Sequence, residues 1–178
     1  ARWSKQYRDS ETTLIPEMDN LIEWLPQNIP PGEETSIVHG DFRLDNMVFD
    51  KNTNEVIAIL DWELSTLGHP IADFTYHMMT WRMPLGVQGI GILGANLQEL
   101  NIPNEDEYAE AYYRKTNRNE IQNWDFFLAY NMFRLAGITQ GIAGRVRDGT
   151  ASSDQAKQYG AFVPILSQMA WKIVEGIK

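Results

Sequence analysis

One long apolar pattern constrains the fold more than any other feature of the sequence. From Ile121 to Val146, apolar side chains recur every three or four residues over about seven turns, and Gly149 follows where such a helix can end. A helix of this length predicts the central core of a mainly helical domain. The chain of 178 residues is long enough to bury a core of its own, so we expect one compact domain over residues 1–178.

Shorter helical patterns surround this segment. They cover residues 12–27 with Pro16 in the first turn, the segment from Pro70 to just before Pro84, residues 105–116, and a last helix that starts at a capping box, Ser152 to Gln155, and bends at Pro164. Residues 85–104 are rich in glycine and lack periodicity, which predicts a long surface loop. The G-x-G-x-x-G letters at Gly89–Gly94 follow no strand and open no helix. We therefore interpret them as a flap or a close-packed turn and not as a phosphate loop.

Three short β-type runs precede the helix at Pro70, at residues 35–38, 46–49 and 55–60. Residues 50–54 between the last two runs have the polar composition of a hairpin turn. We therefore predict an α+β fold that is mainly α and carries a small β-hairpin.

The densest polar cluster of the chain, residues 39–46, lies at the entrance to this hairpin. Hairpin geometry places Asn46 at the start of one strand and Asp61 at the end of the other, and Asp41 lies on the loop that enters this edge. Carboxylate and amide oxygens suit a hard cation such as Mg²⁺. The plainer alternative makes Asp45 and Asn46 turn formers and Asp61 a strand-end cap.

Phosphoryl transfer uses such an arrangement, because it needs a carboxylate beside the attacking hydroxyl and oxygen ligands for metals on the nucleotide phosphates. Arg43, two residues after Asp41, is placed to offer a positive charge to the transferring group.

These residues also carry a family resemblance. His39-x-Asp41-x-x-x-x-Asn46 followed by Asp61 resembles the catalytic loop and metal-binding Asp of protein-kinase-like phosphotransferases. His39-Gly40-Asp41, residues 59–63 and residues 68–73 are similar to the aminoglycoside and choline kinase-like branch. Residues 2–7, 102–108 and 133–138 are similar to the kinase-like domain associated with acyl-CoA dehydrogenases.

The resemblance implies a role for each of these residues. Asp41 would be the catalytic base, and Asn46 and Asp61 would bind the Mg²⁺ that holds ATP. Asp73 would support the backbone of the loop, and His39 would brace the same loop. The resemblance also implies the fold of the C-terminal lobe of a kinase, a small-molecule hydroxyl as acceptor, with a hydroxyacyl-CoA as one such acceptor, and an acyl-CoA dehydrogenase as partner. Many relatives have Asp at the position of His69, and many aminoglycoside kinases have Pro-Gly at the position of Leu44-Asp45. These differences argue against assigning the antibiotic specificity of those kinases to this chain.

A complete kinase of this type needs an upstream lobe with a phosphate-covering loop and a strand lysine. Only 38 residues precede His39, and they show little strand pattern. The first residue is Ala and not Met, so we expect a segment of a longer chain whose N-terminal lobe is absent here. We expect the segment alone to bind nucleotide weakly and to turn over negligibly.

Charge and composition exclude other classes of function. The net charge of −9 opposes binding to nucleic acid, and no apolar stretch approaches the ~20 residues that span a bilayer. The chain has no cysteine, which excludes disulfides and zinc–thiolate sites and fits a reducing, cytoplasmic compartment.

Several side chains receive a structural interpretation. We expect Arg134, within the central apolar helix, to pair with a carboxylate or else to reach the cleft, and Glu63 to brace the turn at Asp61. His69 and His77 are interpreted as ordinary surface or helix residues, and the aromatic residues Trp124, Phe126 and Phe127 as packing.

Two rival functions stay open on the residues alone. The first is a catalytically silent kinase-like module that binds a nucleotide or a CoA ester beside a dehydrogenase. The second is a metal-dependent phosphoesterase that uses the same carboxylates.

Overall fold

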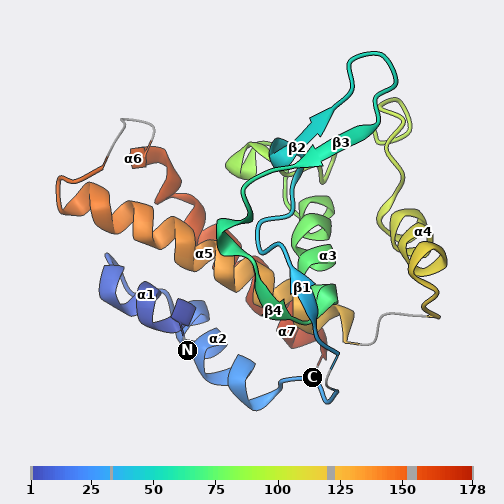
Figure 1. Cartoon of the computed structure of the whole chain (residues 1–178). Coiled ribbons are helices and arrows are strands. Elements are labelled where there is room, and N and C mark those ends of the chain that lie inside the picture. The colour runs from blue at the N-terminus through green and yellow to red at the C-terminus, as the bar shows by residue number, and fades with distance from the viewer. Residues whose placement is uncertain (1, 33, 120–122, 152–155, 178) are drawn as a thin grey trace.

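The computed structural model describes residues 2–32, 34–119, 123–151 and 156–177 and is mainly helical (Figure 1). The helices are α1 (Arg2–Ser10), α2 (Pro16–Gln27), α3 (Pro70–Met78), α4 (Glu105–Thr116), α5 (Trp124–Arg147), α6 (Ala156–Tyr159) and α7 (Phe162–Ile177). The strands are β1 (Ser36–Val38), β2 (Met47–Phe49), β3 (Val56–Ile59) and β4 (Thr66–Gly68). Single 3₁₀ turns cover η1 (Leu44–Asn46), η2 (Trp62–Leu64), η3 (Met79–Trp81) and η4 (Val87–Gly89). The predicted α+β class, mainly α, is confirmed.

Helix α5 forms the centre of the molecule, as its apolar pattern predicts. It packs against α7, α1 and α3, and Leu128, Met132 and Ala136 on it are fully buried. Gly144 lets α1 approach closely, because a Cβ atom there would lie 2.8 Å from Cβ of Ser10. Ile121, the first position of the predicted pattern, lies outside the described residues.

Two small antiparallel sheets are built beside the helices. Strands β2 and β3 form the predicted hairpin, with Met47 opposite Ile59, and Figure 1 shows this hairpin projecting away from α5. Its turn is held by Asp50, whose Oδ1 accepts hydrogen bonds from the amides of Asn52 and Thr53 at 2.8 and 3.0 Å. Strand β1 pairs with β4. The sequence does not predict β4, because this strand is three residues long and its partner β1 is distant in the chain.

Some predicted boundaries are wrong. Helix α2 begins at Pro16 and not at residue 12, with Pro16 in the first helical turn. Asn46 belongs to the 3₁₀ turn η1 and precedes the strand that we expect it to begin. Pro164 does not kink a helix, because the break falls before Phe162 and places this proline in the first turn of α7. The predicted capping box at 152–155 lies outside the described residues.

Two further segments differ from expectation. Helix α1 is absent from the predicted elements, although Tyr7 on it is fully buried. The glycine-rich segment 85–104 is mostly exposed, as predicted for a surface loop, but it is also attached to the helices: Val87 is buried, and the amide of Ile92 donates to the carbonyl of Thr80 at 3.0 Å. A Cβ atom at Gly91 would lie 2.1 Å from the carbonyl oxygen of Pro84, so the close-packed interpretation fits Gly91, whereas Gly89 and Gly94 have open space around them and a positive φ.

None of the helices in the described ranges is both long enough and apolar enough to cross a membrane.

Candidate active site

The polar cluster forms a loop, residues 39–46, that joins β1 to β2 and that we call the catalytic loop. His39 at its start is buried, with 2% of its surface exposed. Its Nε2 lies 2.8 Å from the carbonyl oxygen of Leu60, and its Nδ1 accepts a hydrogen bond from the amide of Asp41 at 3.2 Å. With Nε2 as the donor and Nδ1 as the acceptor, a neutral imidazole satisfies both contacts. His39 therefore ties the start of the loop to the end of β3.

Asp73, on the first turn of α3, lies beneath the same part of the loop. Its Oδ1 accepts a hydrogen bond from the amide of Gly40 at 2.8 Å, and its Oδ2 accepts one from the amide of His39. Hydrogen bonds to a charged acceptor are about twice as strong as neutral ones. A single carboxylate thus fixes two successive peptide units directly before Asp41.

Asp41 is held through both of its side-chain oxygens. The hydroxyl of Tyr76, on α3, donates to Oδ1 at 2.7 Å, and Nδ2 of Asn46 donates to Oδ2 at 3.1 Å and to the carbonyl oxygen of Asp41 at 2.8 Å. Burial and the neighbouring charge of Asp41 raise the pKa of Tyr76, so the phenol stays protonated and donates. Sequence reasoning misses Tyr76, whose only signal is a polar hydroxyl on the buried stripe of a short helix.

The prediction that Arg134 pairs with a carboxylate is wrong. Its guanidinium donates to the carbonyl oxygen of Gly40 and lies 4.8 Å from the ring centroid of Tyr76 and 5.2 Å from that of Trp3. No salt bridge to Arg134 is present in the part of the chain that the structure describes. A backbone carbonyl and two aromatic faces take the place of the expected acid.

Asn46 and Asp61 meet at the open end of the hairpin. The amide of Leu60 donates to the carbonyl oxygen of Asn46 at 2.8 Å, which brings Asp61 next to the end of the catalytic loop. Asp61 has a left-handed backbone with φ of 63° and is exposed, with no side-chain cap on η2. The alternative in which this side chain caps the strand end therefore has no contact in its favour.

These two residues fit a hard divalent cation. Nδ2 of Asn46 is occupied by Asp41, so its Oδ1 is the atom left for a metal, and Asp61 offers an exposed carboxylate. Across the described residues, no three His, Cys, Asp or Glu side chains gather into a metal-binding cluster. A magnesium ion here would therefore take its remaining ligands from water and from a bound phosphate.

Arg43 and Glu63 lie near this end. Arg43 pairs with Asp45 on the surface and is close enough to Asp41 for the two charges to interact. Burial acts to lower the pKa of Arg43, but the hydrogen bond and charge of Asp45 outweigh it, so the pKa is raised. Glu63 is exposed on η2 and makes no hydrogen bond within the described ranges, so its predicted bracing of the turn at Asp61 has no contact to support it.

The two other histidines have more specific surroundings than we expect. His69 caps α3, since its Nδ1 accepts from the amide of Ile71 at 3.2 Å, and its ring lies 4.7 Å from that of Phe127. His77 packs against the rings of Trp81 and Tyr108 at 5.5 and 5.4 Å. Burial lowers the pKa of both histidines.

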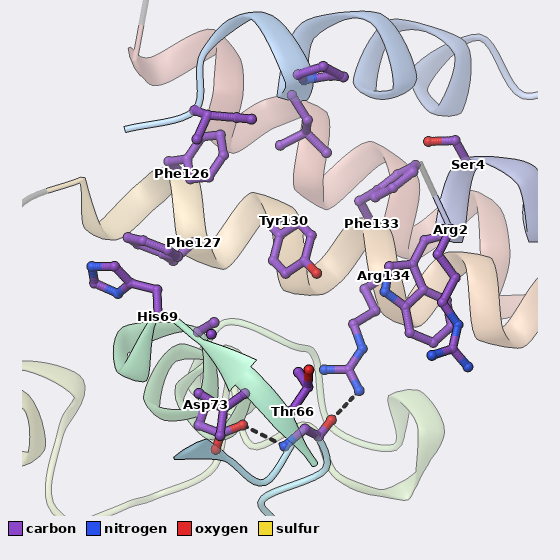
Figure 2. Close-up of a pocket in the computed structure, with 18 of the residues that line it drawn as sticks. Arg2, Ser4, Thr66, His69, Asp73, Phe126, Phe127, Tyr130, Phe133 and Arg134 are labelled. Carbon is purple, nitrogen blue, oxygen red and sulfur yellow. Dashed lines mark hydrogen bonds between the residues drawn. The ribbon is translucent and has the colours of Figure 1, made fainter. Parts of the chain in front are cut away.

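The aromatic residues interpreted as packing differ among themselves. Trp124 donates from Nε1 to Oε1 of Glu105 at 3.1 Å, and Phe126 packs against Trp24. Phe126 and Phe127 also line a pocket beside the catalytic loop (Figure 2).

Comparison with known proteins identifies the family of this chain. Residues 1–120 match the model of the phosphotransferase enzyme family. A crystal structure from Ralstonia eutropha JMP134, described as a candidate aminoglycoside phosphotransferase, superposes with a TM-score of 0.93 at 50% identity and covers 98% of this chain and 54% of its own.

Two curated relatives are much longer than this chain. Acyl-CoA dehydrogenase family member 10 of Mus musculus is 42% identical over 170 residues, which are 95% of this chain and 16% of that protein. Acyl-CoA dehydrogenase family member 11 of Homo sapiens is 40% identical over 168 residues, 93% of this chain and 21% of that protein. The chain therefore spans about a fifth or less of these relatives.

Proposed function

Because the chain belongs to the phosphotransferase enzyme family, we propose that it is the C-terminal lobe of a Mg²⁺-dependent kinase that moves the γ-phosphoryl group of ATP to a hydroxyl of a small molecule. The observation that carries the proposal is the catalytic loop itself. It presents Asp41 in a fixed orientation and ends at Asn46, beside the exposed Asp61. A base and two oxygen ligands in this order are what phosphoryl transfer requires.

Asp41 acts on the acceptor in this mechanism. Its carboxylate orients the attacking hydroxyl and takes the proton as the new O–P bond forms and the bond to ADP breaks. Tyr76 and Asn46 hold the two carboxylate oxygens, so little reorganisation is needed when the acceptor arrives. The positive charge of Arg43 stabilises the negative charge on the phosphoryl group during transfer.

Asn46 and Asp61 would hold the metal. When bound, Mg²⁺ neutralises charge on the nucleotide phosphates and orients them. The chain's own contribution is to fix Asn46 through Asp41, so that the base and a metal ligand are positioned by the same hydrogen bonds.

The nucleotide also needs a covering lobe with a lysine for its phosphates. In our proposal a preceding segment of a longer chain supplies this lobe, which agrees with the 54% of the Ralstonia eutropha chain that is covered. The relatives named as acyl-CoA dehydrogenase family members favour a hydroxyacyl-CoA as the acceptor and a dehydrogenase as the partner.

The test is a transfer assay with the full-length protein, Mg²⁺ and γ-labelled ATP. We expect the label to move to a hydroxyacyl-CoA and not to the matched acyl-CoA that lacks the hydroxyl, nor to an aminoglycoside. Binding of ATP without transfer to any hydroxyl would instead identify the silent binding module. Phosphate release from esters without nucleotide would identify the phosphoesterase.

A further inference from the structure

A pocket of about 580 Å³ lies behind the catalytic loop, between α2, β4 and α5 (Figure 2). This volume is within the range of small-molecule sites in proteins. The walls are mainly apolar and aromatic, and one end carries positive charge. Residues that define these two parts are Leu25, Ile29, Phe127, Tyr130 and Phe133 on the walls, and Arg2 and Arg134 at the charged end.

Arg134 is the unusual member of this lining. Only 8% of its surface is exposed, yet it has no salt bridge within the described part of the chain. Its guanidinium makes one hydrogen bond, to Gly40, and its Nε is buried without a hydrogen-bond partner. The rings of Tyr76 and Trp3 and the carbonyl oxygen of Gly40 are its partners, and none of them carries a full negative charge. A buried cation is stabilised most by a paired anion, so this end of the pocket is suited to an anionic group.

The rest of the lining limits the charge of that anion. Asp73 also lines the pocket, although both its oxygens are already occupied by backbone amides. One buried cation and one carboxylate in the same lining favour a monoanion over the dianion of a phosphate ester. The apolar walls favour an uncharged remainder.

We propose that this pocket binds a monocarboxylate with an apolar tail, whose carboxylate pairs with Arg134 and whose tail lies along the aromatic wall of α5. The guanidinium is planar and presents several donors, which suits a carboxylate. Phe127, Tyr130 and Phe133 lie in successive turns of α5 and give the tail a continuous surface.

The site goes beyond the proposed phosphoryl transfer and does not depend on it. The pocket is lined by Gly40 but not by Asp41, so the ligand binds beside the catalytic loop and not at the presumed base. Its binding can therefore be measured without nucleotide, acceptor or turnover.

The experiment is calorimetric titration of the protein with octanoate. Acetate carries the charge without the tail, 1-octanol the tail without the charge, and octylamine the opposite charge. We expect octanoate to bind at least tenfold more tightly than each of these three. Extending hexanoate to octanoate should tighten binding about fourfold for each added methylene.

Two sets of variants locate the site. Arg134→Gln removes the charge and should abolish the preference for octanoate over 1-octanol. Because Arg134 also contacts the catalytic loop, a second pair avoids the core: Ile29→Glu against Leu14→Glu. Both side chains are 70% exposed, but only Ile29 lines the pocket, so only Ile29→Glu should weaken octanoate binding, by about tenfold or more.

Three results would overturn the proposal. They are no binding of octanoate to the folded protein at millimolar concentration, equal affinity for octanoate and 1-octanol, and an equal effect of the two glutamate variants. The first denies a site, the second an anion site, and the third its location in this pocket.

Discussion

The two ends of the catalytic loop are held in different ways. At the first end, His39, Gly40 and Asp41 are fixed by three side chains of the helical body: Asp73, Tyr76 and Arg134. At the second end, Asn46 leads into a projecting hairpin and Asp61 is exposed (Figure 1).

The contrast separates the two tasks of the site. Hydrogen bonds to charged groups are worth about 1.5–3 kcal/mol each, so the helical body orients Asp41 before any substrate binds. An exposed ion pair such as Arg43–Asp45 is worth about 1 kcal/mol or less. In the proposed mechanism the end at Asn46 and Asp61 is thus left for the nucleotide and its metal to order, while Asp41, the proposed base, is positioned by the fold.

The largest expected effect is on turnover. Asp41→Asn should lower kcat of the proposed phosphoryl transfer by the full-length protein by about 10²–10⁴-fold, the range for a general base. Stability should fall by about 1.5–3 kcal/mol, since the amide oxygen still accepts a hydrogen bond from Tyr76 but the amide nitrogen cannot accept the one from Nδ2 of Asn46. Asp106→Asn, an exposed acid on α4, is the matched control and should retain full activity. Equal kcat in the two variants would remove Asp41 from the mechanism.

The next effect compares the two ends by stability. Asp73→Ala removes both hydrogen bonds to the loop amides and should lower the free energy of unfolding by about 2–4 kcal/mol. Asp45→Ala at the exposed end should cost about 1 kcal/mol or less. Urea denaturation of both variants measures the difference, and equal losses would contradict the contrast between the ends.

Tyr76→Phe tests the contact with Asp41 more finely. The variant keeps the ring beside Arg134 and loses only the hydroxyl, so it should cost about 1–2 kcal/mol of stability and lower kcat about tenfold with an unchanged KM for ATP. Tyr108→Phe on α4 is the control, with a change within about 0.5 kcal/mol. A higher KM for ATP with an unchanged kcat would assign Tyr76 to binding and not to the orientation of Asp41.

The smallest expected effect is on the pH dependence of stability and concerns His77, in the last turn of α3. Burial lowers its pKa, so in the unfolded chain it binds a proton near the ordinary pKa of about 6.5, whereas the folded protein does so only at lower pH. Unfolding between these values takes up a proton, and stability therefore falls as the pH drops through 6.5. His77→Gln should reduce this loss between pH 7 and 5.5 by less than about 1 kcal/mol, measured by urea denaturation. An unchanged pH dependence would show that His77 titrates alike in both states.

Sequence reasoning succeeds where the signal is local. The apolar repeat predicts α5, and the polar turn at 50–54 predicts the hairpin, because neighbouring residues carry both patterns. The loop residues His39, Asp41 and Asn46 are likewise close in the chain, and the hairpin brings Asp61 to them.

Some failures are local, such as the start of α2 at Pro16 and the missed helix α1, but those at the site involve distant partners. Tyr76 reaches Asp41 across 35 positions and Arg134 reaches Gly40 across 94, and neither contact has a local pattern. The expected acid for Arg134 is replaced by a carbonyl and two rings, which burial cost alone does not distinguish from a salt bridge. Strand β4 is too short to show alternation, and only its pairing with β1 defines it.

The most direct test of the account is Asp61→Asn in the full-length protein. Asparagine tolerates the left-handed backbone at this exposed position, so the melting temperature should stay unchanged. We expect Mg²⁺-dependent transfer from ATP to be lost while the protein remains folded. Full transfer activity with an unchanged melting temperature would show that Asp61 does not hold the metal and would contradict the proposed site.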